Sequence, residues 1–175
     1  MTPSTLDVTT LPDSFEYKGV QLVDLVDQIK QTVEFWGSIG LVKQVDSLGF
    51  AILVTRDKMF KDWDDPSYYV DFVGGWGEDK LGYIANAVRK MRPALRESED
   101  TLTISERFPE YFKDTVQMQD DDGSFGWGDF PHGGATFVTF GNEYFLVAVS
   151  ALTAQEDDLV ASFIGKLLGK AARLT

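Results

Sequence analysis

The one histidine of this chain, His132, has the most adaptable chemistry near neutral pH. It stands within residues 129–134, DFPHGG, directly before a pair of glycines. An imidazole can ligate a metal, protonate a leaving group or hydrogen-bond a carboxylate. Gly133 and Gly134 let the backbone turn tightly and let a ligand approach it closely. The stretch therefore predicts a ligand site, and the alternative is that His132 is a partly exposed turn residue.

A carboxylate beside His132 would turn the same stretch into an acid–base site. Asp129 and Glu143 are the two candidates for orienting the imidazole, with His132 as general acid or base. Arg89 is a candidate for ligand binding, because it lies at helical spacing with two further arginines. Arginines so placed can bind a ligand carboxylate through two parallel hydrogen bonds, and the alternative is a charged outer helix face.

Aromatic residues make up 13% of the chain and gather in two stretches between the expected elements. Flat apolar ligands bind well between such rings, which lose little conformational entropy on stacking. Trp76, Trp127 and Phe130 are therefore predicted to contact a ligand, and the alternative is that the rings form core or a subunit interface. The two stretches hold Trp63, Tyr68, Tyr69, Phe72 and Trp76, and then Phe125, Trp127 and Phe130.

Composition excludes several classes of site. The 175 residues include no cysteine, so a disulfide framework, a cysteine-ligated zinc ion, an iron–sulfur cluster and a cysteine nucleophile are excluded. With one histidine in the chain, a metal site of two or three histidines is excluded as well. The formal net charge of −12 repels phosphate groups, so we expect neither nucleic acid nor an anionic membrane as a partner.

Apolar periodicity predicts the elements that position these residues. Helices are expected over residues 20–36 and 79–92, and Pro93 is expected to end the second one. That second helix carries Arg89 and Lys90 on a face predicted to be charged and solvent-exposed. The other elements expected before the last third are strands over residues 50–56 and 68–72 and a short helix near residues 109–118.

The last third of the chain has the clearest pattern. Residues 135–140 and 143–150, ATFVTF and EYFLVAVS, predict a β-hairpin joined by a two-residue Gly-Asn turn. Thr153 and Glu156 form a capping box that begins a final helix, with Asp157 in the first turn, where the helix dipole favours negative charge. Helices separated by an antiparallel hairpin indicate the α+β class, with one antiparallel sheet and helices packed on it.

We expect one domain over residues 17–175, preceded by a polar arm over residues 1–16. The arm lacks the basic and apolar regions of a signal peptide, and no apolar run reaches the length that spans a membrane. A cytoplasmic protein is therefore expected.

The run from Gly133 to the last helix resembles the GlcG/HbpS-like family, which is related to haem-binding proteins. The family pattern is Gly-Gly-x-Pro-x, a short turn, a strand ending in Gly-x-Ser-Gly, and Glu-Gln-Asp-Glu at the start of the last helix. This chain has GGATF, VAVSA and QEDD at the matching places, so it lacks the proline and carries alanines for the glycines around Ser150. The likeness covers about residues 20–170 in the order of elements and about residues 133–165 in motif.

The resemblance implies a profilin-like fold, in which a central antiparallel sheet of about five strands is flanked by helices. It also implies a homo-oligomer with a site for a small molecule, haem being the candidate cofactor. In that case His132 is the imidazole that would ligate the iron. Ser150 lies in the small-residue element that would let a ligand sit against the sheet, and the alanines beside it narrow that space.

The predicted function is binding of a small, largely flat apolar molecule between the aromatic loops and the hairpin that follows Gly133 and Gly134. A first alternative is an enzyme that uses the same pocket and His132 for acid–base chemistry on a small hydrophobic substrate. A second alternative is a ligand-free interaction subunit, with the aromatic loops as its oligomer interface.

Overall fold

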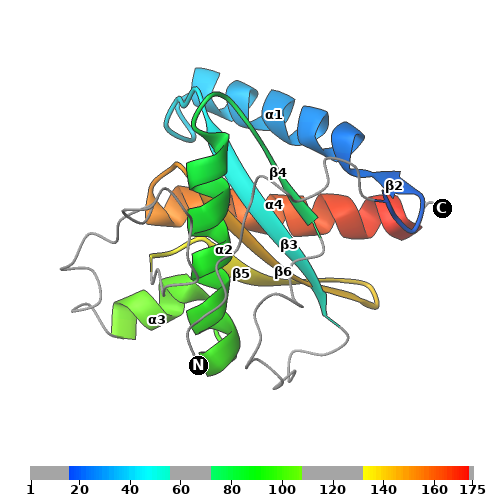
Figure 1. The fold of residues 1–175 in the computed structure, drawn as a ribbon, viewed down its shortest axis with the longest axis vertical. Helices are drawn as coiled ribbons and strands as arrows, with labels where there is room; N and C mark the ends of the chain where they lie inside the picture. The colour runs from blue at the N-terminus through cyan, green and yellow to red at the C-terminus, as the bar shows by residue number, and fades with distance from the viewer. Residues whose placement is uncertain (1–15, 56–71, 108–131, 174–175) are drawn as a thin grey trace.

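The computed structural model describes residues 16–55, 72–107 and 132–173 of the chain. A four-stranded antiparallel sheet lies between helices on both faces, and a small two-stranded hairpin packs beside it (Figure 1). The elements in chain order are β1 (Glu16–Tyr17), β2 (Val20–Gln21), α1 (Leu22–Ser38), β3 (Leu48–Thr55), β4 (Phe72–Trp76), α2 (Lys80–Glu97), α3 (Thr101–Arg107), β5 (Ala135–Phe140), β6 (Glu143–Ser150) and α4 (Ala154–Arg173).

The strand order of the main sheet is β4-β3-β6-β5, so β3 and β6 are its two central strands. Both faces of the central strands are covered, which explains why their sequences are almost continuously apolar. On β3, Phe50 and Ile52 face α1 and α4, while Ala51 and Leu53 face α2. The sheet therefore separates two apolar cores, one under α1 and α4 and one under α2.

This architecture confirms the predicted α+β class with a helix-flanked antiparallel sheet. The helix expected over residues 20–36 is α1, and the strand expected over 50–56 is β3. The sheet has four strands within the described residues, against the about five that the family resemblance implied.

The C-terminal hairpin and its following cap form as predicted. Phe140 pairs with Glu143 across a two-residue turn, and Gly141 supplies a positive φ of 62°. The amide of Glu156 donates to Thr153 Oγ1 at 3.4 Å, and the amide of Thr153 donates to Glu156 Oε2 at 3.0 Å. These reciprocal bonds satisfy donors that a helix leaves unpaired at its start, so α4 begins at Ala154.

Two predicted boundaries were wrong. Helix α2 does not end before Pro93 but continues through it to Glu97, where Ser98 takes a left-handed cap with φ 54°. Met91 and Leu95 bury their side chains under the sheet, and this packing outweighs the hydrogen bond that the proline removes. Strand β4 occupies Phe72–Trp76, most of which was predicted to be loop.

Several other predictions fall outside the described residues. Residues 68–71 of the second expected strand and the helix near 109–118 lie there, as do residues 1–15 of the polar arm. Glu16, assigned to that arm, belongs to the β1–β2 hairpin. Before residue 108, where the sequence predicts no definite element, the structure has the short helix α3.

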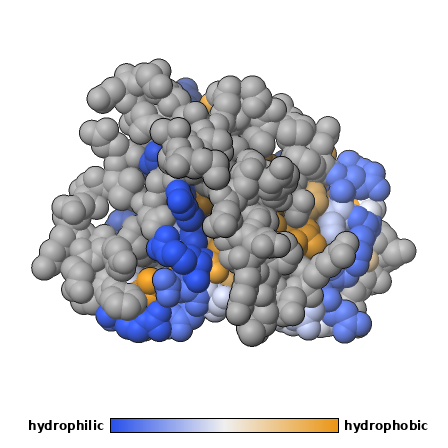
Figure 2. Space-filling view, turned by 60° about the horizontal axis from the view of Figure 1, so that its bottom comes forward, coloured by the Kyte–Doolittle hydropathy of each residue, from blue (hydrophilic) through white to orange (hydrophobic). Residues whose placement is uncertain are grey.

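On the face turned forward in Figure 2, the described residues at the surface are mostly hydrophilic, and hydrophobic ones show only in small areas between them. Among the described helices, none is long and apolar enough to cross a membrane.

Candidate functional site

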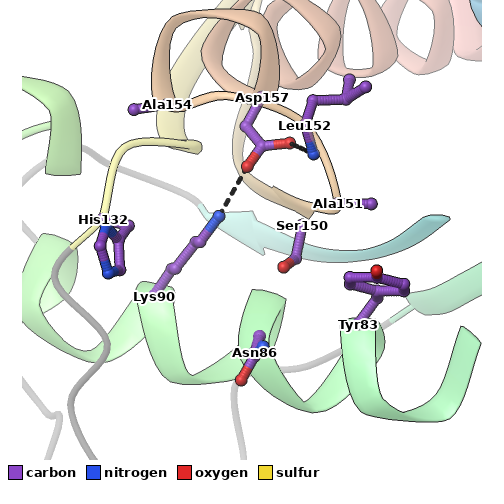
Figure 3. A pocket seen from close by; sticks show the side chains of 9 residues that line it. All are labelled: Tyr83, Asn86, Lys90, His132, Ser150, Ala151, Leu152, Ala154 and Asp157. Carbon is purple, nitrogen blue, oxygen red and sulfur yellow. Dashed lines mark hydrogen bonds and ion pairs between the residues drawn. The ribbon is translucent and has the colours of Figure 1, made fainter. Parts of the chain in front are cut away.

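A cavity of about 260 Å³ opens where β6 ends, between α2 and the first turn of α4. Six of its nine lining side chains carry a polar group, and they come from three separate parts of the chain (Figure 3). Helix α2 contributes three of them at helical spacing. The lining residues are Tyr83, Asn86, Lys90, His132, Ser150, Ala151, Leu152, Ala154 and Asp157.

A buried ion pair forms the inner wall of this cavity. Lys90 Nζ donates to Asp157 Oδ2 at 2.9 Å and to the carbonyl oxygen of Val149 at 2.7 Å. The other carboxylate oxygen of Asp157 accepts the amide of Leu152 at 3.0 Å. Only 2% of the Lys90 side chain and 4% of the Asp157 side chain are exposed. The pair thus ties α2 to the end of β6 and to the start of α4.

Gly134 makes room for this ion pair. A Cβ on Gly134 would lie 2.7 Å from the Val149 carbonyl oxygen, 2.7 Å from Asp157 Cβ and 3.1 Å from Lys90 Nζ. The residue also has a φ of +121°, which side chains rarely adopt. The space left by the missing side chain is therefore filled by the protein itself. This corrects the prediction that Gly134 leaves room for a ligand.

Gly133 is explained by packing as well. A Cβ there would lie 3.0 Å from the Cβ of Ala154 and 3.1 Å from Leu102 Cδ1. The glycine pair lets the chain pass closely between α3 and the start of α4, and so it holds His132 at the cavity.

Burial opposes the charged form of Lys90, His132 and Asp157, which line this cavity. Desolvation lowers the pKa of Lys90 and raises the pKa of Asp157, while their mutual attraction and hydrogen bond act in the opposite direction. The pKa of His132 is lowered by desolvation and by the positive charge of Lys90. His132 is therefore a neutral imidazole at neutral pH, able to donate from one ring nitrogen and to accept at the other.

Asn86 lies in the lining on the same side of α2 as Lys90. Its side chain is buried, with 3% of the residue exposed, and its Oδ1 atom accepts no hydrogen bond from any described residue. Buried polar atoms in native proteins nearly always have a partner, so this atom requires an explanation.

The structure brings some of the predicted site residues together. His132 and Ser150 both line the cavity, and Gly133 and Gly134 form the adjoining backbone. Asp129, Trp127 and Phe130 lie outside the described residues.

The structure separates three other predicted residues from the cavity. Trp76 packs in the core under α1, on the opposite face of the sheet, and borders a different hollow of about 470 Å³ beside α1. Arg89 is buried, but it is not in the described lining of the cavity. Glu143 begins β6 and accepts hydrogen bonds from Tyr17 and Lys18, whereas Ser150 ends that strand about 23 Å away. These placements correct the predicted contacts of Trp76, Arg89 and Glu143 with the His132 site.

Sequence reasoning missed Lys90, Asp157 and Asn86. It assigned Lys90 to an exposed charged face and Asp157 to the dipole of its own helix. A usable signal was present, because Tyr83, Asn86 and Lys90 recur at helical spacing. The apolar stripe of α2 runs beside them, and only the fold shows that Asn86 and Lys90 are buried as well.

The chain was compared with known proteins. No protein-family model matches it, and no curated protein matches it significantly. Its structure is similar to that of the Ybr137w protein, with 17% identity over 85% of this chain and 76% of that one, and a TM-score of 0.52. This likeness shows a shared fold.

Two further structures are similar to this chain. The DUF336 protein ORFY of Klebsiella pneumoniae is 13% identical over 96% of this chain and 99% of that one, with a TM-score of 0.46. A double mutant of HbpS of Streptomyces reticuli is 16% identical over 96% of this chain and 97% of that one, with a TM-score of 0.45. The similar structures thus include a double mutant of HbpS.

Proposed function

We propose that this protein binds a small molecule in the cavity between α2 and the start of α4, as a divergent member of the GlcG/HbpS-like family. The observation that carries the proposal is the collection of six polar side chains around one cavity of about 260 Å³. Small-molecule sites are concave and place a few polar groups among apolar walls. Here Ala151, Leu152 and Ala154 provide the apolar part.

The buried Lys90–Asp157 pair supports this proposal. Removing two charges from water costs several kcal/mol per ion, and apolar replacements of similar volume are often neutral or stabilising. Perturbed ionisable groups in a cavity are therefore candidates for a functional site. The stability of the fold therefore does not by itself explain why a lysine and an aspartate, rather than two apolar side chains, line this cavity.

The described walls do not fit a haem. Cavities for drug-sized ligands measure about 300–1,000 Å³, and this cavity is smaller. Trp76, one of the three rings predicted to enclose a flat apolar ligand, lies on the other face of the sheet. We expect a small and more polar ligand instead. A haem absorption band that shifts on titration and is lost in His132→Ala would contradict this expectation.

Catalysis in the same cavity is a second candidate. A neutral His132 beside a desolvated Lys90 and Asp157 is the kind of group that can accept a proton from a bound substrate. An enzyme of this kind would lose turnover in His132→Gln while retaining its fold and its ligand.

Native mass spectrometry of the protein purified from its own source tests the proposal. We expect a bound small molecule in the wild type and a reduced bound fraction in Ser150→Leu, which places an apolar side chain in the cavity. The matched control is Thr139→Leu, at the exposed position of the otherwise largely buried strand β5. Absence of any adduct, or equal adducts in both variants, contradicts the proposal. The same spectra read the subunit number, which we expect to be that of a homo-oligomer.

If Ser150→Leu does not fold, Tyr83→Trp serves in its place, because it enlarges a side chain that lines the same cavity from α2. Circular dichroism of each variant establishes whether its fold is retained.

A further inference from the structure

We infer that Asn86 selects the ligand of this cavity, and that the ligand is a small uncharged compound with a hydroxyl or amide N–H that donates to Asn86 Oδ1. This inference rests on the proposed function, because it specifies the chemistry of the molecule that the cavity binds.

The first step of the argument is the unpaired atom. Asn86 is 97% buried and is one of the residues that line the cavity, and its Oδ1 atom accepts no hydrogen bond from the described residues. The backbone of α2 offers no donor, since the amides inside a helix are already bonded to carbonyls one turn earlier. A buried acceptor without a partner is costly, so a donor from a bound molecule is the natural complement.

The second step compares Asn86 with the neighbouring acceptor. Each carboxylate oxygen of Asp157 already accepts one hydrogen bond, from Lys90 at one oxygen and from the Leu152 amide at the other. Asn86 Oδ1 accepts none from the described residues, so a ligand donor relieves the larger cost at Asn86. Figure 3 shows Asn86 one helical turn along α2 from Lys90.

The third step concerns charge. The positive charge of Lys90 and the negative charge of Asp157 are 2.9 Å apart, and they largely cancel. His132 is neutral as well, because its pKa is lowered. The cavity therefore presents no net charge to attract a charged ligand, and desolvating an unpaired charge there would be unfavourable. An uncharged alcohol or amide fits these walls.

Two probes of almost the same shape test the inference. Cyclohexanol donates a hydrogen bond, whereas cyclohexanone only accepts one. Their affinities are measured by NMR titration of the full-length protein. We expect the wild type to bind cyclohexanol about fivefold or more tightly than cyclohexanone, as one hydrogen bond to a buried acceptor would give. Asn86→Leu has a similar volume and is expected to lose this preference.

The matched control is Gln31→Leu, which replaces an exposed amide on α1 and is expected to keep the preference for cyclohexanol. If Asn86→Leu does not fold, Asn86→Ala serves in its place. Equal affinities for the two probes in the wild type, or the same preference after loss of the Asn86 amide, overturn the inference and leave the proposed function standing. Binding of neither probe to the wild type overturns the inference and counts against the proposed cavity site as well.

Discussion

The two ends of β6 each carry a lysine–carboxylate pair, and the pairs differ in almost every physical respect. At the start of the strand, Lys18 and Glu143 have side chains 53% and 15% exposed. At its end, Lys90 and Asp157 have side chains only 2% and 4% exposed. The pKa of Glu143 is lowered, chiefly by hydrogen bonds from Lys18 and Tyr17, whereas burial raises the pKa of Asp157. The same kind of ion pair is therefore partly exposed to water at the start of β6 and buried at its end.

This difference indicates different roles. The pair at the start of β6 fastens the β1–β2 hairpin, where Tyr17 also contacts the rings of Phe72 and Phe145 edge to face at centroid distances of 5.8 and 5.9 Å. The pair at the end of β6 borders the cavity beside His132. A surface pair of the first kind contributes little to stability, while a buried pair is costly to break.

Breaking the buried pair is expected to have the largest effect. Lys90→Met leaves the Asp157 carboxylate buried without its cation, which is expected to lower the free energy of unfolding by about 3–5 kcal/mol. The double variant Lys90→Met/Asp157→Leu is expected to recover most of that loss, because no unpaired charge remains. Urea unfolding of the three proteins measures both values.

The control for this change is Lys30→Met. Lys30 Nζ lies 3.9 Å from Glu34 Oε1 on the exposed face of α1. Loss of this pair is expected to lower the free energy of unfolding by about 0.3–0.5 kcal/mol. A Lys90→Met variant as stable as Lys30→Met would contradict the account of the buried pair.

A side chain at Gly134 is expected to have the next largest effect. Gly134→Ala places a methyl group 2.7 Å from the Val149 carbonyl oxygen, in a backbone with φ +121°. Overpacking and backbone strain together are expected to lower the free energy of unfolding by about 3 kcal/mol. Gly40→Ala is the matched control, since Gly40 has φ +77° and nothing within 4 Å of the added methyl group. Equal losses in the two variants would show that the ion pair does not need this space.

The pH dependence contributed by His132 is expected to be smaller. Because its pKa is lowered on folding, the unfolded chain binds the proton more readily than the native protein does. This contribution to stability is present above the ordinary histidine pKa of about 6.5 and is lost as pH falls through the lowered value. Unfolding free energies between pH 7 and pH 5 should show this decline, and His132→Gln should flatten it. An unchanged decline in His132→Gln would assign it to other groups.

Loss of the exposed pair is expected to have the smallest effect. Glu143→Gln should lower the free energy of unfolding by at most about 1 kcal/mol near neutral pH. Since the pKa of Glu143 is lowered, its stabilisation is present above its ordinary pKa and disappears as pH falls through the lowered value. Wild type and variant should therefore have converging melting temperatures in acid. A large loss of unfolding free energy at neutral pH would contradict this prediction, because it would show that the β1–β2 hairpin contributes strongly to stability.

Local signals predicted much of the fold. The Gly141 turn and the Thr153 capping box depend on neighbouring residues, and both form as expected. Pro93 was misleading because tertiary packing overrides a local helix breaker. The cavity was partly predicted through His132 and Ser150. Lys90 and Asp157 were not predicted, since they are 67 residues apart and their pairing depends on how α4 lies over the sheet.

The most direct test of the central claim is to locate binding within the molecule. In an amide NMR spectrum, titration with cyclohexanol is expected to shift the signals of Asn86, Ser150 and Leu152 around the cavity, and Ser150→Leu is expected to abolish these shifts. Signals of the Trp76 hollow, on the other face of the sheet, are expected to stay in place. Shifts confined to that hollow, or an absence of shifts around the cavity, would contradict the account.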